Sequence, residues 1–174
     1  MDIGLKTTPE GEEYLIIDKV LELLQNQLPE GIEIVGINIL PEGSKAIMAV
    51  VNQACYRAEV PLLEPTDYGA FTQACENWLA KEEILGDRFQ KGKKVTRNIR
   101  PFVREITVLS QESPDRYWLN LDIITGNTGS VRPVEVLESI GASEGIKIDL
   151  DGVFIIRDGV YILQDNGEQL SPLD

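Results

Sequence analysis

The spacing of apolar residues along the chain changes from a helical repeat to an alternating one. Near the N-terminus, apolar residues recur at intervals of three and four, which predicts an amphipathic helix over 17–28. These residues are Ile17, Val20, Leu21, Leu24 and Leu28. Over 117–123 the odd positions are apolar and most even positions are polar, as in a half-buried antiparallel strand. Helices mainly in the first half and an antiparallel sheet in the second half predict an α+β fold.

Turn residues and helix caps divide the first half into shorter elements. Residues 32–40 alternate in character and are predicted as a strand, and Ser44 is a suitable N-cap for a helix that reaches Val51. A second strand is expected over 56–62. Pro65-Thr66-Asp67 then begins a helix with an apolar side. That side comprises Tyr68, Phe71, Cys75, Trp78 and Leu79.

The second half is predicted to hold one sheet and a short helix. Residues 93–99 and 103–109 are expected as neighbours of 117–123, with a turn at 90–92. Pro133 is expected near the first position of a helix that Gly141 ends. Asp158-Gly159, between two apolar runs, predicts a type I′ hairpin. Because no linker-like tract divides the chain, we expect a single α+β domain over 1–164 and a polar tail over 165–174.

The distribution of apolar residues also bears on localisation. No apolar run approaches the roughly 18 residues that span a bilayer, so no membrane association is expected. The segment Met1–Lys6 lacks a basic region followed by a long apolar stretch, and thus no secretory signal is expected. These features predict a cytoplasmic protein.

The residue types present exclude several classes of active site. The chain has no histidine, which excludes Ser-His and Cys-His nucleophile pairs and histidine-ligated metals. Two cysteines, Cys55 and Cys75, are too few for a disulfide framework or a zinc knuckle, and Cys75 is expected as a buried thiol. Asp149-Leu150-Asp151-Gly152 lacks the later ligands of a calcium loop. We therefore expect neither a metal nor a cofactor, and no catalytic residue is assigned.

Charge is distributed unevenly along the chain. The formal net charge is −13, yet residues 88–104 hold seven basic residues and no acidic one. The remainder has nine basic residues against 29 acidic ones, a net charge of −20. This basic island comprises Arg88, Lys91, Lys93, Lys94, Arg97, Arg100 and Arg104.

Within the basic island, the predicted strand over 93–100 carries candidate phosphate contacts on both faces. They are Lys93 and Arg97 on one face, and Lys94 and Arg100 on the other. Spaced lysine and arginine side chains suit phosphate, since arginine forks match its oxygens. Two structural alternatives stay open: an edge strand protected by its lysines, or neutralisation of the acidic body.

A glycine-containing loop precedes the predicted helix at Pro133. Its sequence is Gly126-Asn127-Thr128-Gly129-Ser130-Val131-Arg132. Glycines before a helix can expose backbone N–H groups to an anion, and Arg132 would lie beside such a site. The loop has neither a Walker lysine nor a dinucleotide fingerprint, so a plain strand-to-helix turn is the alternative.

The chain carries a series of short blocks in a set order. They are Ile3-Gly4-Leu5-Lys6, Gly11-Glu12-Glu13-Tyr14-Leu15, Leu28-Pro29-Glu30-Gly31-Ile32, Lys93-Lys94-Val95, Ile99-Arg100-Pro101-Phe102-Val103, Gly129-Ser130-Val131-Arg132-Pro133 and Val136-Leu137. In this order they resemble the radical SAM-linked family of uncharacterised domains also called DUF2344. Members normally carry an N-terminal section with a glycine-phenylalanine-asparagine-proline motif, so we expect an excised or naturally shortened domain. Asn98 stands where an aspartate is common.

The resemblance implies a radical SAM enzyme as partner, in cis or in trans. Such an enzyme holds its iron–sulfur centre with three cysteines, which Cys55 and Cys75 cannot supply. The leading hypothesis is therefore an accessory domain that presents a substrate to that enzyme, with RNA as the candidate substrate because of the basic island. One alternative is a stand-alone nucleic-acid-binding module, and another is an enzyme with a lysine or carboxylate site.

Overall fold

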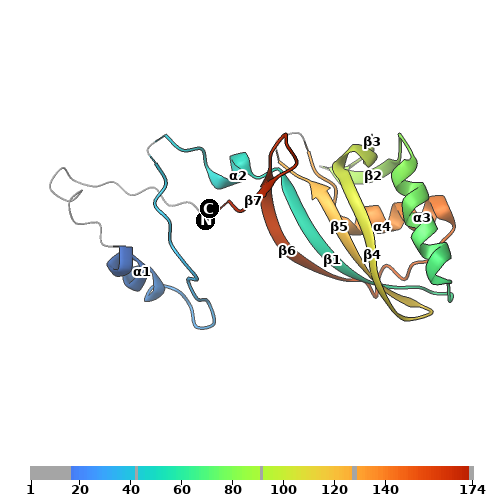
Figure 1. The fold of residues 1–174 in the computed structure, drawn as a ribbon, viewed down its shortest axis with the longest axis horizontal. Coiled ribbons are helices and arrows are strands. Elements are labelled where there is room, and N and C mark those ends of the chain that lie inside the picture. The colour runs from blue at the N-terminus through green and yellow to red at the C-terminus, as the bar shows by residue number, and fades with distance from the viewer. Residues whose placement is uncertain (1–16, 42, 91, 127–128, 173–174) are drawn as a thin grey trace. The chain divides into compact units, whose positions relative to one another are not determined.

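The computed structural model describes residues 17–41, 43–90, 92–126 and 129–172 (Figure 1). The chain divides into two compact units, residues 1–47 and 48–172, each described here by itself. The blocks at Ile3–Lys6 and Gly11–Leu15, together with Lys91, Asn127 and Thr128, lie outside the described residues.

The N-terminal unit contains the predicted amphipathic helix as α1 (Ile17–Gln25). The strand predicted over 32–40 is wrong, because these residues form no strand. The side chain of Gln25 binds this segment instead: its Nε2 donates to the Ile32 carbonyl at 2.8 Å, and its Oε1 accepts from the Ile34 N–H at 2.8 Å. The next helix, α2 (Ile47–Val50), begins at the last residue of this unit and continues into the C-terminal unit; it is a single turn and is shorter than predicted.

The C-terminal unit is built on an antiparallel sheet with the order β4-β5-β1-β6-β7. Its main elements follow a strand-helix-strand-strand-helix-strand sequence. They are β1 (Gln53–Pro61), α3 (Tyr68–Ala80), β4 (Val103–Ser113), β5 (Arg116–Ile124), α4 (Pro133–Glu144) and β6 (Phe154–Leu163), followed by β7 (Gln169–Leu170). The α+β class is confirmed. The strands expected over 103–109 and 117–123 are present within β4 and β5, and the one expected over 56–62 corresponds to β1, which ends at Pro61.

Helices α3 and α4 lie against one face of this sheet, as Figure 1 shows. Alternate residues of the central strands, such as Val60 and Leu119, are fully buried on that face. The ring of Phe71 stacks on Tyr117 with 4.2 Å between centroids. Each such side chain contributes about 1.5–3 kcal/mol by burial. Phe71 and Trp78 of the apolar side predicted for α3 therefore form core, whereas Tyr68 is 41% exposed. Cys75 belongs to the core at 1% exposure, which confirms the predicted buried thiol.

A separate hairpin joins β2 (Leu85–Gln90) and β3 (Lys93–Asn98). The prediction that 93–99 neighbours 103–109 in one sheet is wrong, because the 3₁₀ turn η2 (Arg100–Phe102) redirects the chain after Ile99. The carboxamide oxygen of Asn98 accepts from the N–H groups of Ile84 and Arg100, each at 3.0 Å. An aspartate here would keep both bonds but would lose the bond that Asn98 Nδ2 donates to the Glu82 carbonyl at 3.3 Å.

Two turn predictions in the second half are also wrong. Helix α4 does not end at Gly141 but continues to Glu144, and Gly145 caps it at φ 73°. A side chain at Gly141 would meet the Ile146 carbonyl at 2.9 Å, so this glycine serves close packing. Asp158-Gly159 forms no hairpin: β6 is one strand paired with β1, and the two residues lie at a bulge opposite Cys55 and Tyr56.

Candidate phosphate-binding site

The β2–β3 hairpin separates the predicted basic residues onto two faces. Lys93 and Arg97 lie on one face, and the register adds Arg88, which pairs with Val95. Lys94 lies on the other face. Arg88 belongs to the basic island but lies outside the strand pattern over 93–100, from which the candidate phosphate contacts were predicted. Only the pairing of β2 with β3 shows that Arg88 lies on the same face as Lys93 and Arg97.

On the second face, Lys94 is paired with a carboxylate. Its Nζ lies 2.8 Å from Asp87 Oδ2, with both side chains about half exposed, and Thr96 Oγ1 donates to Asp87 Oδ1 at 2.6 Å. The bond from Lys94, helped by that from Thr96, holds the pKa of Asp87 below its usual range. This arrangement matches the neutralisation alternative.

Arg100 is directed into the protein. Its Nε and one terminal nitrogen donate to the Leu79 carbonyl at 2.9 and 2.6 Å, and the other terminal nitrogen donates to the Val103 carbonyl at 2.5 Å. The guanidinium carbon also lies 5.7 Å from the centroid of the Trp78 ring. Leu79 is near the end of α3, where helix carbonyls lack intrahelical partners. Arg100 therefore satisfies a helix terminus and uses its donors within the protein.

Arg97 joins the hairpin to the glycine loop. One terminal nitrogen donates to the Ser130 carbonyl, and the guanidinium carbon lies 5.0 Å above the Phe102 ring. Gly129 permits this approach, since it has φ 123° and a side chain there would come within 3.0 Å of the Phe102 ring. The structure thus brings together two segments that the sequence predicts separately.

A carboxylate in the first turn of α4, that of Glu135, binds the residue that precedes the helix. The Glu135 carboxylate accepts from the backbone N–H of Arg132 at 3.0 Å and from its guanidinium at 2.9 and 2.7 Å. Burial opposes ionisation of Glu135, but these bonds and the charges of Arg132 and Arg88 outweigh it and lower its pKa. The helix N-terminus is therefore satisfied internally, while the Arg132 side chain stays 61% exposed.

Four cations thus belong to one face of the hairpin and to the adjoining loop. Arg88, Lys93 and Arg97 are on the hairpin, and Arg132 is in the loop. The described contacts place one carboxylate among them, that of Glu135. Arg97 keeps further N–H donors besides the one on Ser130, and Lys93 is exposed. Such an arrangement can bind successive phosphates of one strand through guanidinium forks and a mobile ammonium. We call these four residues the cationic cluster.

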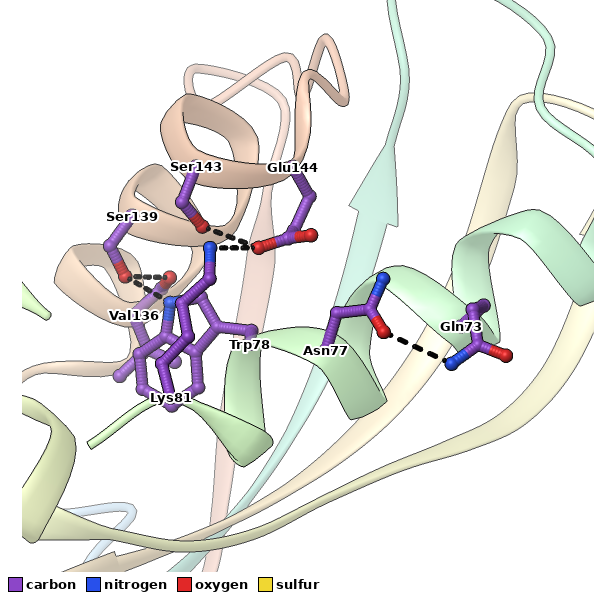
Figure 2. Close-up of polar contacts among 8 residues, drawn as sticks. All are labelled: Gln73, Asn77, Trp78, Lys81, Val136, Ser139, Ser143 and Glu144. Carbon is purple, nitrogen blue, oxygen red and sulfur yellow. Dashed lines mark hydrogen bonds and ion pairs between the residues drawn. The ribbon is translucent and has the colours of Figure 1, made fainter. Parts of the chain in front are cut away.

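A second polar group links α3 to α4 (Figure 2). Trp78 Nε1 donates to Ser139 Oγ at 3.0 Å, and Lys81 pairs with Glu144, which also accepts from Ser143 Oγ at 2.9 Å. A surface depression of about 320 Å³ adjoins these residues. Lys81 lowers the pKa of Glu144, which makes this carboxylate a weak base. The group therefore fixes the two helices and does not activate a serine.

Among the described residues, no group of three or more His, Cys, Asp or Glu is placed to hold a metal ion. Within the same residues, no helix is both long and apolar enough to cross a membrane.

The topology of the C-terminal unit defines its class. Two strand-helix-strand halves interleave in one antiparallel sheet, which is the ferredoxin-like, or split βαβ, arrangement. The sequence model of the family described as "Uncharacterized protein conserved in bacteria (DUF2344)" matches residues 2–133, and the chain belongs to this family. The match includes β1 to β5 and ends at the first residue of α4. A comparison with curated proteins found no match.

Proposed function

We propose that this chain is an accessory domain of a radical SAM enzyme, in cis or in trans, and that it presents an RNA substrate through the cationic cluster. Support for the partner comes from the family resemblance. Support for the substrate comes from the placement of Arg97, which Ser130 and Phe102 hold on the hairpin face of the exposed Lys93, against the loop that carries Arg132. A fold of this kind hosts many activities, so the argument rests on the site.

The fixed position of Arg97 favours binding to phosphate. A free arginine loses rotamer freedom when it binds, whereas Arg97 is already held by one hydrogen bond and one ring contact. The negative charge of the remaining chain also restricts where RNA can bind. With a net charge of −20 outside the basic island, RNA is repelled from most of the surface and attracted to this cluster.

The proposal predicts a salt dependence that particular residues control. Binding of a fluorescent single-stranded RNA should weaken with salt, and each lost phosphate contact should reduce the slope by about 0.7 log units per log unit of salt. Arg97→Ala and Lys93→Ala are expected to show that reduction. Lys94→Ala should leave the slope unchanged, because Lys94 lies on the opposite face. Lys147→Ala is the control for an exposed, paired lysine elsewhere.

Two measurements separate the proposal from its alternatives. The radical SAM enzyme should co-elute with the chain and bind RNA more tightly with it than without it. RNA binding without co-elution would indicate a stand-alone nucleic-acid-binding module. Equal slopes for wild type and the Arg97→Ala, Lys93→Ala double variant, alone and with the enzyme, would exclude the phosphate role.

A further inference from the structure

The sheet face turned away from α3 and α4 has an ordered layout of side chains. Cross-strand pairing places Phe154, Glu59 and Trp118 in one row over β6, β1 and β5. Two rows further along, Gly159, Cys55 and Asp122 lie side by side, and Glu105 of β4 follows. One end of this face is therefore aromatic and the other acidic.

The aromatic end exposes apolar surface. Phe154 is 56% exposed, and Trp118 is half-buried with its indole N–H on Glu112 at 2.8 Å. The charged residues nearby pair with each other. Arg116 binds Glu59, while Arg57 binds Asp158 through two hydrogen bonds of 2.7 and 2.8 Å. Because these charged side chains bind each other, the rings of Trp118 and Phe154 are the apolar surface left at this end for a partner to contact.

The acidic end contains polar groups with unmet hydrogen-bonding capacity. Asp122 is 8% exposed and Gln53 is fully buried; Gln53 Nε2 donates to Asp122 Oδ2 at 3.1 Å. Asp122 Oδ1 and Gln53 Oε1 have no hydrogen-bond partner among the described residues. Buried acceptors without donors are costly.

Charges of both signs lie around these acceptors. Glu105 is the direct cross-strand neighbour of Asp122, and like charges in that position repel. Arg104 lies close enough for its charge to act on Cys55. Burial and the bond to Asp122 raise the pKa of Cys55 to about 12, so Cys55 is a neutral thiol and its S–H is a weak donor to this carboxylate.

We infer that this face docks a polypeptide segment of a partner protein, with a lysine or arginine of that segment at Asp122 and the exposed Glu105 and an apolar side chain on Trp118 and Phe154. Charge complementarity selects the occupant: the two carboxylates of Asp122 and Glu105 outnumber the one arginine described near them, so a further cation is attracted, whereas RNA would bring phosphates to them. Identification of the partner with the radical SAM enzyme rests on the proposed function. The docking surface itself is separate from the cationic cluster.

The sheet geometry sets the spacing within that segment. The aromatic row and the Asp122 row are four residues apart along β5, which is about 13 Å at 3.3 Å per residue. An extended segment would span this distance with its apolar and basic residues four positions apart.

The test uses the two tryptophan indole N–H signals in ¹⁵N-labelled full-length chain. The probe is a pool of decapeptides that fix leucine and arginine four residues apart and are random elsewhere; the control pool has glutamate in place of arginine. The arginine pool should shift the Trp118 signal and leave that of Trp78, which is buried under α4, in place. Asp122→Asn should weaken the response at least tenfold, as should Phe154→Ala.

Matched variants make the outcome specific. Asp151→Asn removes an exposed acid elsewhere, and Leu85→Ala removes an exposed apolar side chain from the hairpin; neither should change the response. Equal shifts from both pools, no shift from either, a shift from oligouridine alone, or a shift that accompanies self-association of the chain would overturn the inference. Arg97→Ala should retain the peptide response, so failure of the RNA proposal and failure of this one are distinguishable.

Discussion

Arginines of one basic segment have opposite roles in this protein. Arg100 donates to two backbone carbonyls and lies over Trp78, whereas Arg97 uses one donor on Ser130 and keeps others. The difference follows from the chain direction. Arg97 is still in β3, but Arg100 is the first residue of η2, which turns it toward the end of α3.

Arg100→Ala should therefore affect stability and leave RNA contact unchanged. Loss of hydrogen bonds to a charged donor and of a cation–π contact should lower the free energy of unfolding by about 2–4 kcal/mol. Arg100→Lys should restore only part of this, because an ammonium lacks the planar fork. Urea unfolding measures both changes. A reduced RNA salt slope at unchanged stability would contradict this assignment and return Arg100 to the phosphate site.

Residue type and spacing predicted the candidates but could not separate them. Alternation assigns Arg100 to the face of Lys94, yet the turn at Ile99 ends the strand before it. The role of Arg88 depends on pairing between β2 and β3, and the unpaired acceptors of Gln53 and Asp122 arise from strands 69 residues apart. Neither relation leaves a local signal in the sequence.

At the level of elements, local signals succeeded where a segment supplies its own partners. Helix α3 begins as predicted because Asp67 caps it, accepting from the Gly69 N–H at 2.9 Å. Asp158-Gly159 has the chemistry of a hairpin turn, but β6 pairs along its length with β1 and the two residues form a bulge. Arg57, 101 residues away, binds the Asp158 carboxylate there. Pairing with β1, and not the local turn chemistry, therefore determines the structure of residues 158–159.

The contact between the hairpin and the glycine loop depends on Gly129. Gly129→Ala places a side chain at φ 123° and within 3.0 Å of the Phe102 ring, so strain of about 1–3 kcal/mol is expected. The loop should move from the hairpin and release Arg97 from Ser130. We expect lower stability together with a reduced RNA salt slope.

Gly145→Ala provides the comparison for this element-level prediction. Gly145 also has a positive φ, but a side chain there meets nothing within 4 Å. It should lower stability through backbone strain and preserve the salt slope. An unchanged slope in Gly129→Ala, measured by RNA anisotropy on folded protein, would show that the loop does not position Arg97.

For the whole molecule, composition and periodicity predicted the α+β class but not the strand order. In the order β4-β5-β1-β6, β5 pairs with β4 on one side and with β1 on the other. No local sequence pattern encodes this placement of β5 between the two strands. The resulting unit has the cationic cluster on its hairpin and loop, and an acidic and aromatic surface on the sheet face opposite the helices. RNA and a basic polypeptide segment could then bind separate surfaces of one domain.

This charge distribution predicts opposite effects of salt on folding and on RNA binding. A chain with net charge −13 repels itself when compact, and ions screen that repulsion over about 10 Å at 0.1 M. Raising sodium chloride from 0.02 to 0.5 M should therefore raise the melting temperature while RNA affinity falls. Asp151→Asn, which removes an exposed acid, should raise the melting temperature at low salt and reduce its salt dependence. Calorimetry and RNA anisotropy on the same samples measure the two trends. A melting temperature that falls with salt would mean that ion pairs such as Arg57–Asp158 and Arg116–Glu59 outweigh the net repulsion.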